Sequence, residues 1–111
     1  MNDEISIQLQ FSEIIKKDSV VLFLKGCANF PICGLSSTVS HILKKNKIKH
    51  SCVNLLGYPN LHKFLRDKYY PIVAPYLFVN SKFVGGFDEI TALHNAGKID
   101  SLIKDNNLIG T

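Results

Sequence analysis

The stretch SVVLFLKGCANFPICGLS, residues 19–36, joins an apolar run to a short loop that holds two cysteines. Residues 19–25 are almost continuously apolar and partly β-branched, which is typical of a central strand covered on both faces of its sheet. Cys27 and Cys33 follow among small and turn-forming residues. The loop therefore places two thiols directly after a predicted central strand.

The residues after this loop predict a helix and then a second strand. Apolar residues return at helical spacing, and the pattern ends in lysines and Asn46. Residues 48–56 (IKHSCVNLL) have the composition of a strand. Because a strand–helix–strand crossover within one sheet joins parallel strands, we expect these two strands to pair in parallel. The apolar positions of the helix are Leu35, Val39, Ile42 and Leu43.

Helices and a hairpin flank this unit. Helical spacing predicts a first helix over about residues 5–17 and another over about residues 60–68. Residues 69–86 predict a β-hairpin whose two-residue turn is Asn80-Ser81. The chain thus alternates helices and strands before it ends in helical segments.

Two helical segments are predicted after the hairpin. Asp88 begins the first, and Gly97 ends it as a C-cap. Ile99, Leu102 and Ile103 indicate the second. The whole order predicts a single α/β domain over residues 1–111 with the thioredoxin fold, in which a four-stranded mixed β-sheet is flanked by helices.

The composition limits the partners that the chain is expected to bind. Of its 111 residues 46% are hydrophobic and 20% charged, and the formal net charge is +4. The densest basic run, residues 44–49, ends a predicted helix, where cations complement the helix dipole. Basic and aromatic residues do not interleave, so we expect no nucleic acid as partner. No apolar run reaches the eighteen or so residues of a membrane span, so we expect no membrane partner.

The cysteine count bears on the compartment. Three cysteines cannot form a complete disulfide framework, which favours an intracellular reducing compartment. The first ten residues, MNDEISIQLQ, are typical neither of a signal peptide nor of an Arg-rich transit sequence. We therefore expect a cytoplasmic location, or a mitochondrial or plastid matrix if a presequence has been removed.

Cys33 is the candidate for thiol chemistry. It is predicted to lie between a central strand and the start of the next helix, where unpaired backbone N–H groups and the helix dipole favour a thiolate. Lys25 adds a cation at the end of the strand. A thiolate attacks disulfides and binds soft metals. Because Ser36 stands where a C-x-x-C motif has its second cysteine, an external thiol must take that role.

Two separated motifs resemble those of the monothiol glutaredoxins, over about residues 5–105. The loop KGCANFPICGLS is similar to K-G-T-P-x-x-P-x-C-G-F-S, and VAPYLFVNSKFVGGFDEI is similar to T-[VIY]-P-Q-L-[YF]-V-x-G-x-x-[VI]-G-G-x-D. The matching residues are Lys25, Gly26, Pro31, Cys33, Gly34 and Ser36 in the first motif and Pro75, Leu77, Val79, Gly85, Gly86 and Asp88 in the second.

The resemblance implies that the protein binds glutathione beside a reactive Cys33. Pro75 would be cis, so that the backbone of Ala74 pairs with the cysteinyl arm of glutathione. The alternative is an ordinary trans proline, which base rates alone favour.

The resemblance also implies anchors for the two ends of glutathione. Gly86 and Phe87 would present backbone N–H groups, and Asp88 its carboxylate, to the γ-glutamyl end. Lys25 and Arg66 would bind the glycine carboxylate. Without the resemblance, Gly86 would simply end a strand, Asp88 would cap a helix and Arg66 would face solvent.

Two functions are compatible with one reactive thiolate per chain. In the first, two protomers each contribute Cys33, and two glutathiones the remaining thiolates, to a [2Fe-2S] cluster. This cluster-bridged homodimer would serve iron–sulfur cluster transfer to apo iron–sulfur proteins and redox homeostasis. The alternative is a weak glutathione-dependent thiol–disulfide oxidoreductase, in which a second glutathione reduces a mixed disulfide on Cys33. We favour the cluster carrier.

The chain departs from the family pattern around this site. Cys27 is either a small replacement for the family's threonine or a resolving thiol. The second role requires its Cα atom to lie within about 4.4–6.8 Å of that of Cys33. The other departures are Ala28 for proline, Leu35 for phenylalanine, Val73 for threonine and Tyr76 for glutamine.

A zinc module was weighed as a third class of function. Its ligands would be Cys27, Cys33 and either His50 or Cys52, a spacing that fits no compact zinc finger or ribbon. We expect His50 and Cys52 to serve packing in their strand. We expect the helical histidines to face solvent, namely His41, His62 and His94.

Overall fold

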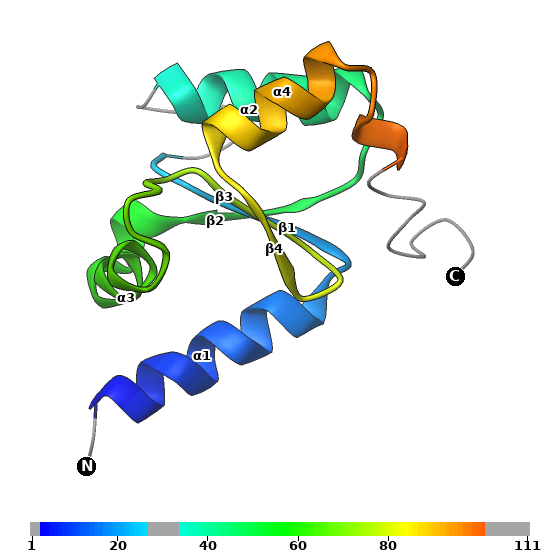
Figure 1. The fold of residues 1–111 in the computed structure, drawn as a ribbon. Coiled ribbons are helices and arrows are strands. Elements are labelled where there is room, and N and C mark those ends of the chain that lie inside the picture. The colour runs from blue at the N-terminus through cyan, green and yellow to red at the C-terminus, as the bar shows by residue number, and fades with distance from the viewer. Residues whose placement is uncertain (1–2, 27–33, 102–111) are drawn as a thin grey trace.

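The computed structural model describes residues 3–26 and 34–101, and its centre is a four-stranded sheet (Figure 1). The strand order is β2-β1-β3-β4. Strand β1 pairs in parallel with β2 and antiparallel with β3, and β3 pairs antiparallel with β4. The predicted mixed sheet and the predicted parallel pair are therefore confirmed. The strands are β1 (Val20–Leu24), β2 (Ser51–Asn54), β3 (Tyr76–Val79) and β4 (Lys82–Gly85).

Two helices cover each face of the sheet, as Figure 1 shows. Side chains from α1 and α3 pack on one face, and side chains from α2 and α4 pack on the other. This layered arrangement is the thioredoxin fold that the order of elements predicted. The helices are α1 (Asp3–Lys17), α2 (Gly34–Lys45), α3 (Pro59–Tyr69) and α4 (Phe87–Asn95).

Strand β1 is buried along its whole length, as is its neighbour β3, because both faces of these two strands are covered. Val21 and Phe23 pack toward α1 and α3, whereas Leu22 and Leu24 pack toward α2 and α4. The α1/α3 side is rich in aromatic rings, with Phe11 meeting Phe78 edge to face at a centroid distance of 5.2 Å. Burial of both faces explains why the strand is apolar without alternation.

The second strand is shorter than its sequence suggests. The predicted strand covered residues 48–56, but β2 ends at Asn54 and residues Leu55–Gly57 form a 3₁₀ turn, η1. The side-chain oxygen of Asn54 accepts a hydrogen bond from the N–H of Leu56 at 3.0 Å, which caps this turn. A local side-chain bond of this kind competes with strand pairing, which ends the strand early.

The predicted hairpin turn and helix end are confirmed. Asn80 and Ser81 have φ values of 52° and 67°, the paired positive values of a type I′ turn. Gly97 has φ 68°, its N–H donates to the carbonyl of His94, and that of Lys98 donates to Leu93. This pair of bonds is a Schellman motif with glycine in the left-handed position.

Residues 99–101 are helical, as predicted for a last segment, whereas Leu102 and Ile103 lie outside the described residues. Among the helices that the structure describes, none combines the length and apolarity that a membrane span requires.

Replacing Gly97 by alanine is expected to lower the free energy of unfolding by about 1 kcal/mol, because a Cβ atom opposes the left-handed backbone conformation. Gly57→Ala is the matched control. A Cβ at either glycine would meet no atom within 4 Å, but only Gly97 has a positive φ. Urea unfolding of the two variants measures the difference. Equal loss of stability in both would contradict the strain argument.

Candidate functional site

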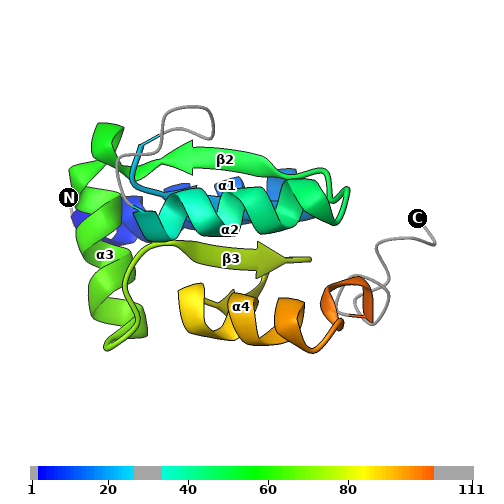
Figure 2. The same cartoon turned by 90° about the horizontal axis from the view of Figure 1, so that it is seen from above.

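Those predicted site residues that the structure describes lie at the end of the sheet where β1 terminates. Figure 2 shows α3 running across this end. Lys25 and Gly26 follow β1, and α2 begins at Gly34, the residue after Cys33. The predicted helix start directly after Cys33 is therefore confirmed. Residues 27–33 lie outside the described residues, so the predictions about Cys27 and the thiol of Cys33 stay predictions.

The side-chain amide of Asn54 joins the end of β1 to the end of β2 and to the turn η1. The Oδ1 atom of Asn54 accepts from the N–H of Gly26 at 3.0 Å, in addition to its bond from Leu56. Gly26 has φ 94°, a conformation that glycine adopts readily. Sequence reasoning missed Asn54. The available signal was an Asx residue directly before a short Leu-Leu-Gly turn.

Lys25 and Arg66, the two cations predicted to bind the glycine carboxylate, lie around the imidazole of His62. His62 and Arg66 are one turn apart on α3 and so share a face. Burial lowers the pKa of His62, and the charges of Arg66 and then Lys25 lower it further. Both cations therefore lie within electrostatic reach of His62. The structure thus places Lys25, directly after β1, and Arg66 of α3 around the same imidazole.

The predictions for the helical histidines are partly wrong. His62 is half-buried, and its Nε2 atom is buried with no hydrogen-bond partner among the described residues. His94 is also half-buried, and its Nδ1 atom lies 3.3 Å from Nδ2 of Asn46. The side of α3 that carries His62 and the side of α4 that carries His94 are both partly covered by neighbouring segments. Helical spacing in the sequence does not reveal this packing. His41 is exposed, as predicted.

The loop before β3 carries the predicted cis proline. The Ala74–Pro75 bond is cis, which confirms the prediction, and Ala74 and Pro75 are buried. The Tyr70–Pro71 bond is also cis, and sequence reasoning missed it. The two cis bonds bracket a tight loop beside the end of α3.

Gly86 holds this loop close to the start of α4. A Cβ atom built on Gly86 would lie 2.8 Å from Cγ2 of Ile72 and 3.2 Å from the carbonyl oxygen of Pro75. Glycine is therefore required here by close approach. Pro75 and Gly86, two residues of the second motif, are in this way brought side by side.

The hydrogen bonding at the start of α4 corrects one expectation. The N–H of Gly86 donates to Oε1 of Glu89 at 2.7 Å, so this N–H already has an acceptor within the protein. The N–H groups of Phe87 and Asp88 lie in the first turn, where a helix supplies no acceptor of its own. Asp88 is exposed within this turn. It is not the helix cap, since Gly86 occupies that position.

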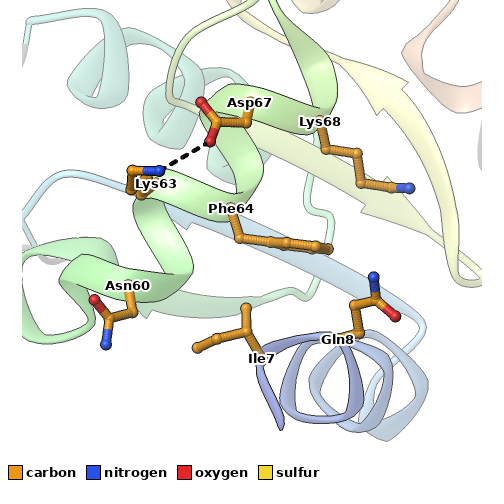
Figure 3. A pocket seen from close by; sticks show the side chains of 7 residues that line it. All are labelled: Ile7, Gln8, Asn60, Lys63, Phe64, Asp67 and Lys68. Atoms are coloured by element: carbon orange, nitrogen blue, oxygen red, sulfur yellow. Dashed lines mark hydrogen bonds and ion pairs between the residues drawn. The ribbon is translucent and has the colours of Figure 1, made fainter. Parts of the chain in front are cut away.

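A groove lies away from these residues, between α1 and α3 (Figure 3). It has a volume of about 620 Å³. None of the described site residues lines it, and its one ion pair, Lys63 with Asp67 at 3.4 Å, is exposed. We therefore assign the groove no part in thiol chemistry. Its lining residues are Ile7, Gln8, Asn60, Lys63, Phe64, Asp67 and Lys68.

The residues weighed for zinc do not form a site within the described chain. Cys52 is exposed on β2, so the expectation that it packs is wrong, because β2 is an edge strand with one incompletely covered face. His50 precedes β2 and is half-buried, with its Nδ1 atom 2.9 Å from the carbonyl oxygen of Ile48. Within residues 3–26 and 34–101, no three metal-ligating side chains come together.

Acidification is expected to destabilise the fold through His62. Its folded pKa is below the usual 6.5, so the unfolded chain binds the proton more tightly. The contribution is complete above about pH 6.5 and is lost as the pH falls toward the lower, folded pKa. Urea unfolding between about pH 7 and pH 5.5 should show a flatter pH dependence for His62→Gln than for the wild type.

His41→Gln is the control for this measurement, because it removes an exposed imidazole. It should keep the wild-type pH dependence. If His62→Gln and His41→Gln give the same profile, the pKa of His62 is not lowered in the folded protein.

Comparison with known proteins identifies the family. No protein-family model matches the chain. The "Probable monothiol glutaredoxin 2" of Rickettsia typhi is 37% identical over 91 residues, which are 82% of this chain and 82% of that protein. The mitochondrial monothiol glutaredoxin-5 of Schizosaccharomyces pombe is 30% identical over 100 residues, which are 87% of this chain and 68% of that protein.

Solved structures agree with these relatives. Reduced poplar apo GrxS14 matches with a TM-score of 0.76 and 28% identity, over 90% of this chain and 92% of that chain. Reduced glutaredoxin C1 from Populus tremula x tremuloides, at 20% identity, supports the fold alone, with a TM-score of 0.82 over 96% of this chain and 89% of that chain. The sequence relatives and the shared fold together show that the chain belongs to the monothiol glutaredoxin family.

Proposed function

We propose that this chain binds glutathione beside Cys33 and carries a [2Fe-2S] cluster as cargo between two protomers. The observation that supports the proposal best is the convergence of three segments at one end of the sheet. These are the Lys25/Arg66 pair, the cis Pro75 loop packed on Gly86, and the start of α2 after Cys33.

Glutathione has an anionic group at each end, and the proposed site offers complementary groups for both. Lys25 and Arg66 would pair with the glycine carboxylate through charge-assisted hydrogen bonds. The N–H groups of Phe87 and Asp88 would bind the γ-glutamyl carboxylate, while the Asp88 carboxylate would accept from its ammonium group. The N–H of Gly86 is left out, because Glu89 already accepts from it.

The middle of the tripeptide would lie along Ala74. Main-chain groups of Ala74, beside the cis bond to Pro75, would pair with the extended tripeptide as in a small antiparallel ladder. The cysteine of glutathione would then lie opposite Cys33. The N–H groups of the first turn of α2 would stabilise the thiolate of Cys33.

The cluster proposal follows from the number of thiolates. A [2Fe-2S] cluster takes four, and Cys33 is the one thiolate that each chain would supply. Cys33 from each of two protomers and two glutathiones would complete the set. A cargo held partly by a dissociable tripeptide can pass to apo iron–sulfur proteins, and we place this activity in an intracellular reducing compartment, either cytoplasm or organelle matrix.

The second candidate function is glutathione-dependent thiol–disulfide exchange. The Cys33 thiolate would attack the glutathione sulfur of a protein–glutathione disulfide and release the protein thiolate. A second glutathione thiolate would then attack the new mixed disulfide, giving oxidised glutathione and restoring Cys33. The favourable surroundings of the thiolate support this reaction as well.

Arg66→Gln and Asp88→Asn are each expected to weaken glutathione binding about ten- to a hundredfold, since each loses a charged hydrogen bond worth roughly 1.5–3 kcal/mol. Lys68→Gln is the control. It removes the same charge as Arg66→Gln from the same helix, at an exposed position. Isothermal calorimetry measures the affinities. Unchanged affinity in both site variants would contradict the assigned contacts.

Anaerobic reconstitution with iron, sulfide and glutathione is expected to give a brown dimer, and Cys33→Ser should remain colourless and monomeric. Cys52→Ser serves as control because it removes another thiol, one exposed on β2. Visible absorption and gel filtration provide the readouts. A wild-type spectrum and dimer in Cys33→Ser would exclude this residue as the ligand.

A further inference from the structure

Eight exposed lysines gather at the end of the sheet opposite the candidate site. Helices α1, α2 and α4 all end there, β1 and β2 begin there, and the β3–β4 turn lies there, as Figures 1 and 2 both show. We name this surface the lysine end. It comprises Lys16, Lys17, Lys44, Lys45, Lys47, Lys49, Lys82 and Lys98.

Contacts between these segments hold the lysine end together. The hydroxyl of Ser81 in the hairpin turn donates to the carbonyl of Ile15 near the end of α1, at 3.2 Å. The Asn46–His94 contact joins the end of α2 to the end of α4. Val21 pairs with Ser51, which places the residues before β2 beside the start of β1. Lysines far apart in the sequence therefore lie on one end of the folded chain.

The charge of this end exceeds what the helices themselves require. Three helix C-termini carry about half a negative charge each. In the described part of these segments the acidic side chains are Glu13, Asp18 and Asp100, and Asp18 accepts a hydrogen bond from Ser51. When the charges of the three helix ends and of the three acidic side chains are subtracted from those of the eight lysines, roughly three to four positive charges remain. Among the described residues, no ion pair is recorded for any of the eight lysines.

The side chains at the lysine end indicate what kind of surface it fits. All its cations are lysines, whereas the chain's one arginine, Arg66, lies at the other end. Arginine is the residue suited to bidentate recognition of nucleic-acid phosphates and base edges. The large exposed apolar side chains of the described residues lie in other segments, so the described residues of this end offer none to stack on bases or to insert into acyl chains. They are Ile5, Leu9, Leu56, Tyr58, Tyr70 and Val73.

We propose that the lysine end docks the protein on a membrane surface rich in anionic lipid, by electrostatic attraction to the headgroups and without insertion. Each lysine near an anionic membrane surface contributes about 1 kcal/mol of attraction, and clusters of four to eight basic residues are typical of segments that bind anionic lipid. The sequence predicted no membrane partner because it lacks a long apolar run, but surface docking needs none. In this orientation the glutathione site faces away from the bilayer. The proposal is independent of the function proposed above.

Sedimentation with lipid vesicles tests the proposal on the full chain. The wild type should bind vesicles of phosphatidylcholine with about 30% phosphatidylserine, and should not bind phosphatidylcholine alone. Lys45→Gln/Lys49→Gln should bind about 25-fold more weakly, at roughly fivefold for each lysine. Salt at about 0.5 M should abolish binding of the wild type.

Lys63→Gln/Lys68→Gln is the matched control, because it removes the same net charge from exposed positions on α3. It should bind the vesicles as the wild type does, and thermal melting of both variants checks that they are folded. Equal weakening by the two variants, or no binding of the wild type at low salt, overturns the proposal. So does tighter binding of the wild type to a DNA duplex that Lys45→Gln/Lys49→Gln removes, because the partner would then be nucleic acid.

Discussion

Burial of β1 on both faces is the constraint on which the rest of this structure depends. Its five side chains are at most 4% exposed, and burying one such apolar side chain stabilises a fold by about 1.5–3 kcal/mol. Two helix layers are needed to cover it, so the chain must cross the sheet and return on each side. Because β1 is central and parallel to β2, the segment after it must lead into a helix. The cysteine loop therefore begins at the middle of the sheet and not at its edge.

The site combines rigid supports with a small number of charged groups. Asn54, at the end of β2, accepts a hydrogen bond from the N–H of Gly26 and so fixes the backbone after β1. Gly86 has no side chain, so the cis proline loop can pack closely against the start of α4. On this frame Lys25 and Arg66 approach the half-buried His62, and their charges disfavour its protonation. An anion bound between them would offset that repulsion. In the proposed complex the glycine carboxylate of glutathione would supply this anion.

The two ends of the sheet have different chemistry, and topology is the reason. In this fold the segments that follow β1 and precede β3 and α4 meet at one end, where backbone donors and a few convergent charges can form a site. The helix C-termini meet at the other end, where lysines are favourable beside the carbonyl groups. The partial negative charges of the helix C-termini balance only part of the positive charge of these lysines. The remainder gives the molecule a polarity that can orient it on a charged surface.

The sequence by itself determined the sheet, the hairpin and the helix that starts after Cys33, because periodicity and turn residues are local signals. The cis Pro75 followed only from the resemblance of the second motif to the glutaredoxin family. The sequence did not determine where β2 ends, since a side-chain bond of Asn54 decides that. It also did not reveal that His62 is half-buried beside two cations, or that the carboxylate of Glu89 accepts the hydrogen bond of the Gly86 N–H. Only the tertiary structure decided that eight lysines spread from position 16 to position 98 share one surface. The physical reason is that the strands and helices take their directions from burial of apolar faces around β1, and the charges of the lysines do not set these directions.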